Sequence, residues 1–111
     1  MRLDTEGGIR VADATEDDIR QAFLDDEGRG EFIILSRGEQ VYLQAANEKD
    51  GAFLLEFRDG DEQNHFQSTR ELSKPEVERA FLQYLAGDDS WRTAFPWRKL
   101  EFPDKPWWKF W

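Results

Sequence analysis

The sequence contains one histidine, His65, which is the first residue to consider for acid–base chemistry. A histidine works as a general base where a nucleophile or an orienting carboxylate lies within hydrogen-bonding distance. Glu56 or Glu62 would supply that carboxylate if the polar stretch around His65 pairs with the apolar run before it. The interpretation that we prefer is a histidine on the solvent-exposed side of a strand. A metal site needs several ligands, and the chain has no second histidine and no cysteine.

Other polar side chains join His65 in the candidate ligand site that the sequence predicts. Tyr42 and Gln44 alternate with apolar neighbours in one apolar run, as Glu56 and Arg58 do in the next. Successive side chains of a strand point to opposite faces, so these residues are predicted on the face away from the core. With His65 they would line a groove for a small ligand or for a minor enzymatic activity. An ordinary solvated face gives the same pattern, and both interpretations stay open.

The familiar motifs for phosphate binding and hydrolysis are missing from the sequence. It contains neither GxGxxG nor GxxxxGK[ST] nor GxSxG. The acidic run from Asp59 to Glu62 lacks the spacing of an EF-hand calcium loop, so we interpret it as a turn with solvated carboxylates. The sequence therefore predicts no metal and no cofactor, and it favours a non-catalytic protein over an enzyme.

Aromatic residues are concentrated at the C-terminal end. All five tryptophans lie after residue 90, together with three of the phenylalanines. Three prolines in the same segment exclude a continuous helix, so we expect an extended strap with a strand at residues 97–102. Large aromatic side chains bury much apolar area, and the strap would complete the core of one domain that spans residues 1–103.

Residues 104–111 form a separate tryptophan-rich tail in this interpretation. Trp107, Trp108, Phe110 and Trp111 are the candidate partner-binding residues. Tryptophan is enriched at the energetic centres of protein interfaces, and an uncovered apolar patch usually marks an interaction site. Packing of the same side chains onto the domain is the competing interpretation. A third interpretation places them, with the neighbouring lysines, at a membrane surface.

The candidate ligand-site residues lie on or next to a predicted β-meander over residues 31–58. Three apolar runs of strand length are separated there by short polar connections that contain glycine, which is the pattern of antiparallel hairpins. Asp59-Gly60 predicts a type I′ turn. A fourth, more polar strand is expected after it at residues 64–69, with Phe66 facing inward.

Two amphipathic helices flank the meander. The first is predicted to begin after Thr15 and to end in a solvated exit loop at residues 25–28. The second is predicted to begin after Ser73, which can form a capping box with Glu76. A short edge strand or a packed arm is expected near residues 9–11. Both helices would cover one face of the sheet, so the predicted fold is a two-layer α+β domain with a meander of three to four strands.

Charge is unevenly distributed along the chain, whose net charge is −9. Residues 1–90 carry 22 acidic and 10 basic side chains, whereas residues 91–111 carry 2 and 5. The acidic body would repel a phosphate backbone, so we expect no nucleic-acid binding; it would suit a protein partner with a basic surface. No apolar run approaches the roughly 20 residues of a membrane helix, and the N-terminus lacks a signal-peptide pattern. We therefore expect no membrane span and a cytoplasmic location.

Several stretches of the chain resemble small bacterial α+β domains. They are Gly28–Leu35, Tyr42–Ala45, Phe53–Gly60, Ala80–Gly87 and the pair Trp91-Arg92. Some small acidic domains of this type are similar to immunity proteins of bacterial toxin systems, which bind and block a cognate toxin. The resemblance covers roughly residues 15–102 and contains no diagnostic motif, so no functional residue is carried over.

The sequence as a whole predicts a non-catalytic domain that binds another protein, as an immunity or accessory protein does. One alternative is a small-ligand-binding domain, or a minor enzyme, with its site at Tyr42, Glu56, Arg58 and His65. A second alternative is a structural domain that forms a homodimer through the uncovered face of its sheet or through its tail.

Overall fold

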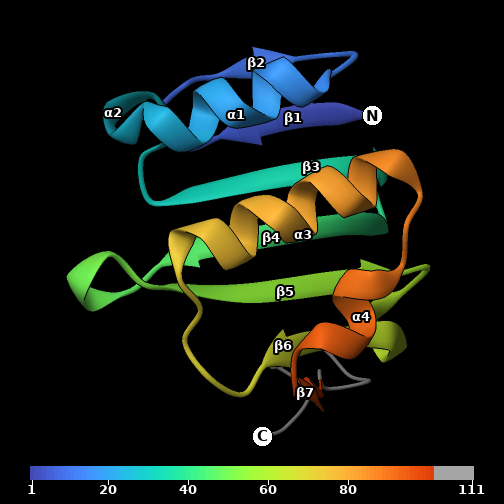
Figure 1. Ribbon diagram of the computed structural model, residues 1–111. Coiled ribbons are helices and arrows are strands. Elements are labelled where there is room, and N and C mark those ends of the chain that lie inside the picture. The colour runs from blue at the N-terminus through green and yellow to red at the C-terminus, as the bar shows by residue number, and fades with distance from the viewer. Residues whose placement is uncertain (102–111) are drawn as a thin grey trace, which may run out of the picture.

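The computed structural model describes residues 1–101, whose strands form one antiparallel sheet with the order β2-β1-β3-β4-β5-β6-β7 (Figure 1). The strands are β1 (Arg2–Thr5), β2 (Arg10–Val11), β3 (Phe32–Gly38), β4 (Val41–Asn47), β5 (Phe53–Asp59), β6 (His65–Ser68) and β7 (Trp97–Lys99). The predicted α+β class with an antiparallel sheet is confirmed. The predicted number of three to four strands is wrong, because the described residues form seven.

The additional strands lie at the two edges of the sheet. The edge strand expected near residues 9–11 is β2, which pairs with β1, and β1 pairs in turn with β3. Only Leu3 and Thr5 of β1 face the core, and so short an alternation cannot be told from a loop by its pattern. At the other edge, β7 pairs with β6 and is shorter than the strand expected at residues 97–102.

The helices α1 (Glu16–Leu24), α3 (Lys74–Ala86) and α4 (Ser90–Ala94) lie on one face of the sheet (Figure 1). The predicted starts of the two longer helices are confirmed, since Thr15 and Ser73 each form a capping box. The exit loop predicted at residues 25–28 is wrong. The Asp25 carboxylate accepts a hydrogen bond from the Gly28 N–H at 2.9 Å and starts a short helix, α2 (Asp26–Arg29). Helix α4 likewise replaces part of the expected extended strap.

The connection from β5 to β6 is not the predicted type I′ turn. That turn needs a positive φ at both central residues, and of the Asp59-Gly60 pair only Gly60 has one, at 105°. The Asp61 carboxylate accepts a hydrogen bond from the backbone N–H of Gln63 at 2.8 Å and starts the 3₁₀ turn η2 (Glu62–Asn64). A similar turn, η1 (Lys49–Gly51), joins β4 to β5.

The core lies between the helices and the sheet and is rich in aromatic side chains. At one end, Phe23 of α1 packs edge-on against Phe81 of α3, with ring centroids 5.4 Å apart. At the other end, Trp91 of α4 is 3% exposed and packs edge-on against Phe57 of β5 at 5.0 Å. Trp91 therefore completes the core, as expected of the segment after residue 90. The predicted tail, residues 104–111, lies outside the described residues.

Replacement of Trp91 by alanine is expected to lower the free energy of unfolding by about 3–5 kcal/mol, the usual effect of removing a large buried aromatic side chain. Leu24 on α1, which is 73% exposed, is the control position. Leu24→Ala is expected to stay within about 0.5 kcal/mol of the wild type. Urea unfolding followed by circular dichroism measures both values. Equal stabilities of the two variants would contradict a core role for Trp91.

The cap of α3 predicts a pH-dependent contribution to stability. Arg70 Nη2 lies 2.9 Å from Glu76 Oε2, and the Ser73 N–H donates to Glu76 Oε1. The Arg70 guanidinium, followed by the Ser73 N–H, lowers the pKa of Glu76 from 4.5 to about 2. A lowered folded-state pKa stabilises the fold above the unfolded pKa, and this stabilisation is lost as the pH falls through the folded-state value.

We therefore expect Glu76→Gln to reduce the free energy of unfolding at neutral pH, and the reduction to shrink as the pH falls towards 2 and to disappear below it. Because the ion pair is partly exposed to solvent, the reduction should not exceed about 1 kcal/mol. Urea unfolding of wild type and variant across this pH range measures the difference. A loss of the same size at both ends of the range would rule out the carboxylate charge as its cause.

Candidate functional site

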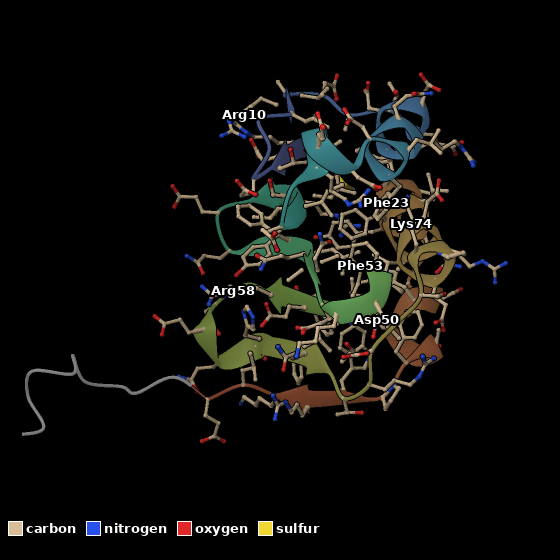
Figure 2. The ribbon with its side chains drawn as sticks, turned by 90° about the vertical axis from the view of Figure 1, so that its left-hand side faces the viewer. Arg10, Phe23, Asp50, Phe53, Arg58 and Lys74 are labelled. Atoms are coloured by element: carbon tan, nitrogen blue, oxygen red, sulfur yellow. The ribbon has the colours of Figure 1, made fainter. Side chains whose placement is uncertain are left out.

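The face of the sheet opposite α1, α3 and α4 carries no helix of the described residues. In Figure 2 the helices lie on one side of the strands, and Arg10 and Arg58 project on the other side. We call this second side the open face. Its side chains come from alternate positions of the strands, and the strand register aligns them in cross-strand rows.

Three such rows cross the open face. The apolar row joins β3, β4 and β5 and consists of Phe32, Ala46 and Leu54. The middle row runs from β1 to β7 through Asp4, Ile34, Gln44, Glu56, Gln67 and Arg98. The histidine row runs from β1 to β6 through Arg2, Ser36, Tyr42, Arg58 and His65.

All four residues of the predicted ligand site lie together in these rows. Tyr42 is paired with Arg58, and Arg58 with His65, in neighbouring strands. The Arg58 guanidinium lies 5.7 Å from the centroid of the Tyr42 ring, and the Tyr42 and His65 rings meet edge-on at 6.0 Å. Glu56 Oε1 lies 3.4 Å from His65 Nε2. The carboxylate predicted to lie across from the histidine is therefore that of Glu56.

The contacts of His65 define its hydrogen-bonding state. Arg58 Nε donates to His65 Nδ1 at 3.0 Å, and an arginine nitrogen can only donate, so Nδ1 is the unprotonated acceptor. The ring proton is then on Nε2, which faces Glu56. This is the arrangement of a histidine held in one neutral tautomer by its neighbours.

His65 is only 5% exposed, so the prediction of a solvent-exposed strand histidine is wrong. Its ring contacts Arg58, Tyr42 and Glu56, and its backbone is covered by the segment that pairs with β6. The backbone N–H of Leu100 donates to the His65 carbonyl at 2.8 Å, and β7 covers the edge of β6 that would otherwise face solvent. The burial of His65 therefore involves, besides the neighbouring strands, a segment more than thirty residues away along the chain.

Glu56 is the centre of the polar contacts in the middle row. Its Oε2 accepts a hydrogen bond from Gln44 Nε2 at 3.4 Å, and its Oε1 lies 3.5 Å from Gln67 Nε2. Gln67 in turn accepts a shorter hydrogen bond, 2.6 Å, from Arg98. The sequence pattern placed Gln44 beside Glu56. It did not indicate Gln67 and Arg98, because their strands had to be paired before their side chains could be assigned to this face.

Tyr42 supplies a hydrogen-bond donor at neutral pH. Burial raises the pKa of its phenol, the Arg58 charge opposes this increase, and the Glu56 charge adds to it. The phenol therefore stays protonated. Tyr42 also lines a surface hollow with Ile34, Ser36 and Gln44, so the candidate site includes a depression beside the row of polar groups.

The open face combines two kinds of surface that protein interfaces use. The apolar row is half-buried and lies next to two rows of polar and charged groups that hydrogen-bond to one another. Apolar contact area flanked by polar groups is the usual composition of an interface. Within residues 1–101, no group of three or more histidine and carboxylate side chains is arranged to hold a metal ion. No helix in this part of the chain is long and apolar enough to cross a membrane.

The other candidate residues, Trp107, Trp108, Phe110 and Trp111, lie outside the described residues. Their assignment as partner-binding residues stays a prediction.

The contact between Arg58 and His65 predicts a single tautomer for the only histidine of the chain. Two-bond ¹H–¹⁵N correlation spectra are expected to show the proton on Nε2 in the wild type. Arg58→Ala should allow both tautomers and reduce the free energy of unfolding by about 1–2 kcal/mol, since a buried acceptor loses a charged donor. Arg98→Ala, on the same face, should leave the tautomer unchanged. A wild-type spectrum with the proton on Nδ1 would show that the Arg58 contact does not control the ring.

No protein-family model, curated protein or solved structure matches this chain. The resemblance to immunity proteins stays a prediction.

Proposed function

We propose that this protein is a non-catalytic domain that binds another protein through the open face, in the manner of an immunity or accessory protein. One observation carries the proposal: the helices cover a single face of the sheet, and the opposite face presents an apolar row beside ordered polar rows. Such a surface offers area, shape and hydrogen-bonding groups in one place. The two ring nitrogens of His65 are engaged by Arg58 and Glu56, which supports a binding role over a general base.

The charge of the chain as a whole supports a partner with a basic surface, whereas the rows of the open face themselves carry three arginines and two carboxylates. The net charge is −9, and the excess of acidic residues lies in the part of the chain that forms the sheet and its helices. Complementary charge speeds association and suppresses unsuitable partners, and its effect weakens as salt is added. The affinity for the partner is therefore expected to fall with rising ionic strength.

A small ligand is the second candidate, favoured by the proximity of Tyr42, Glu56, Arg58 and His65. A protonated phenol and the hollow beside it would suit a small polar molecule. Thermal-shift measurements with a metabolite collection test this alternative, because a ligand present at a hundred times its dissociation constant should stabilise the fold by about 2.7 kcal/mol.

The protein-binding proposal predicts crosslinking from one face of the molecule. A photo-crosslinking amino acid placed at Leu54, in the apolar row, is compared with the same amino acid placed at Leu24, which is exposed on the helical side. Both positions are occupied by leucine, so the two probes differ only in location. We expect one discrete crosslinked protein from position 54 and none from position 24, with the yield reduced by added salt.

The mass of the crosslinked product shows whether the open face binds another protein or a second copy of this chain. A product with the mass of two copies of this chain would support the homodimer alternative, which sedimentation would then confirm. Crosslinking only from position 24 would contradict the proposal. The same experiment with a chain that ends at Pro103 tests whether the tail contributes to partner binding. If Trp107, Trp108, Phe110 and Trp111 contact the partner, the crosslinking yield from position 54 should fall when the tail is removed.

A further inference from the structure

The buried histidine of the open face holds side chains of three strands together. His65 is 5% exposed, and the half-buried side chains of Arg58, Glu56 and Tyr42 contact its ring. Histidine is the side chain that most often changes its charge between about pH 5 and 8. A second proton on this ring would therefore act on the contacts between β4, β5 and β6.

The hydrogen bond from Arg58 requires a neutral ring. Arg58 Nε donates to His65 Nδ1 at 3.0 Å, and a guanidinium nitrogen can only donate. A charged imidazolium has a proton on both nitrogens and accepts no hydrogen bond. Rotation of the ring cannot restore the bond, because the charged ring has no acceptor in any orientation. The second proton on His65 and the hydrogen bond from Arg58 therefore exclude each other.

The carboxylate on the other side of the ring can accept in both states. Glu56 Oε1 lies 3.4 Å from His65 Nε2, which carries a proton in the neutral tautomer and in the charged ring alike. Gln44 and Gln67 donate to the same carboxylate and hold it in position. Once the ring is charged, its contact with Glu56 becomes an ion pair, which is stronger than a neutral hydrogen bond. Glu56 thus favours the charged ring, whereas Arg58 favours the neutral one.

The other titratable and charged groups on the elements around the ring are more distant or exposed. Tyr42 on β4 meets the ring edge-on at 6.0 Å, and its phenol stays protonated at neutral pH. Arg98 on β7 belongs to the middle row, and Lys99 is paired with Phe66, whose ring faces the core. Glu62, on the turn η2 before β6, is exposed. The two side chains of β5 that contact the ring nitrogens therefore have the largest effect on its charge.

Arg58 can leave the ring without becoming a buried, unpaired charge. Its Nη1 donates to Gln40 Oε1 at 2.8 Å, and its guanidinium lies 5.7 Å from the centroid of the Tyr42 ring. Gln40 is exposed and Tyr42 is half-buried, so a guanidinium that turns away from His65 moves towards solvent. The buried charge is then on the ring, where the Glu56 carboxylate pairs with it. A buried charge is tolerated only with such a partner.

We propose that His65 is an acid-sensitive switch of the open face. At neutral pH the ring accepts from Arg58. In acid the ring takes a second proton, forms an ion pair with Glu56 and releases Arg58, so that the open face carries one more positive charge. The effect on binding rests on the proposed function: a partner with a basic surface binds more weakly in acid. The release of Arg58 itself requires no partner.

The test follows side-chain and backbone ¹H–¹⁵N signals of the full chain from about pH 8 downwards until the protein unfolds. His65 is the only histidine, so its ring signals need no assignment, and the Arg58 Nε–H signal is assigned by its loss in Arg58→Lys. We expect the Arg58 signal to move, and to exchange faster with solvent, at the same midpoint as the ring. The backbone N–H of Ile19, buried on α1, is the internal control and should not follow the ring.

Two variants test the coupling from opposite sides of the ring. Arg58→Ala removes the group that must leave, so the ring should bind its second proton about tenfold more tightly than in the wild type. Glu56→Gln removes the partner of the charged ring, so the proton should bind about tenfold more weakly. Arg79→Ala is the matched control for the first variant, since Arg79 is an exposed arginine of α3 on the helical side; its ring should titrate as in the wild type.

The consequence for binding is measured by the crosslinking yield from position 54 at pH values above and below the midpoint of the ring. His65→Gln keeps an acceptor for Arg58 and a donor for Glu56 but cannot take up a proton. We expect the wild-type yield to fall in acid by up to about fivefold, and the decrease to be much smaller in His65→Gln. If no partner is crosslinked at either pH, the proposed function fails, and the spectra still decide whether the switch exists.

Other results of the titration overturn the proposal. The ring could keep a single proton until the protein unfolds, or the Arg58 signal could fail to follow the ring. Equal proton affinity of the ring in the wild type and in Arg58→Ala would show that the two groups are not coupled. If Arg58→Ala does not fold, which the dispersion of the same spectra reveals, the wild-type titration and Glu56→Gln decide the question. An equal decrease of the crosslinking yield in the wild type and in His65→Gln would show that the switch does not regulate binding.

Discussion

The pairing of β4 with β5 is the constraint on which both faces of the sheet depend. Seven consecutive residue pairs hold the two strands in one register. On the helical side this register places Leu43 opposite Phe57 in the core, and on the open face it places Gln44 opposite Glu56. A slip of one residue would move every side chain of a strand to the other face. The core and the open face are therefore specified together.

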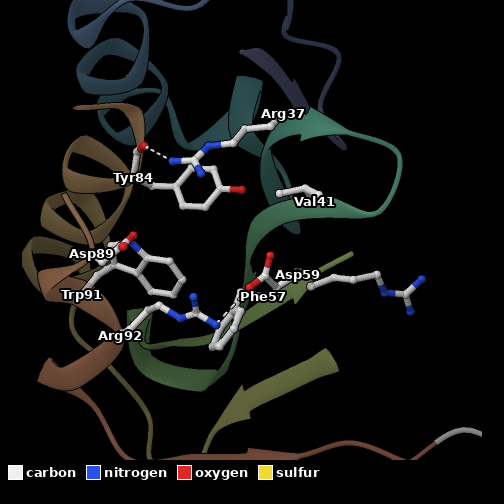
Figure 3. A pocket seen from close by; sticks show the side chains of 9 residues that line it. Arg37, Val41, Phe57, Asp59, Tyr84, Asp89, Trp91 and Arg92 are labelled. Atoms are coloured by element: carbon white, nitrogen blue, oxygen red, sulfur yellow. Dashed lines mark hydrogen bonds and ion pairs between the residues drawn. The ribbon is translucent and has the colours of Figure 1, made fainter. Parts of the chain in front are cut away.

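Phe57 connects this pair of strands to the C-terminal segment. Its ring is stacked on Phe66 at 4.9 Å and lies edge-on to Trp91 at 5.0 Å and to Trp97 at 4.8 Å. These contacts hold α4 and β7 against the sheet, and β7 covers β6 and buries His65. Aromatic packing on the helical side thus helps to hold β7, which pairs with β6 next to the polar cluster of the open face. It also forms one wall of a hollow on the helical side, which Tyr84 and Arg92 line as well (Figure 3).

Arg29 plays a comparable part at the other end of the molecule. It donates to the carbonyls of Ala22 and Phe23 at the end of α1, its Nη2 lies 2.7 Å from Asp26 Oδ1, and its guanidinium lies over the Phe53 ring. Helix α1 has no basic residue in its last turn, so Arg29 supplies the positive charge that a helix C-terminus favours. The sequence pattern did not indicate this role, because arginine is rarely buried without a specific set of partners.

The sequence by itself determined the features that depend on residues a few positions apart. The caps at Thr15 and Ser73 and the placement of Tyr42, Glu56 and Arg58 on one face follow from local spacing alone. The class of fold followed as well, because alternating strands and amphipathic helices must cover each other's apolar faces. The prediction of the turn after Asp59 is wrong even at this local level, since the Asp61 carboxylate accepts a competing hydrogen bond from the Gln63 N–H.

Only the tertiary structure decided the number of strands, the burial of His65 and the hollow that Tyr84 and Trp91 line together. Each depends on segments that meet in space but lie far apart in the chain, such as β1 with β3 and β6 with β7. Strands of three or four residues alternate too briefly to be recognised before they pair. Whether a side chain on a polar strand is exposed or buried depends on which strands pair on either side of it. The spacing of residues within the strand does not show these pairings.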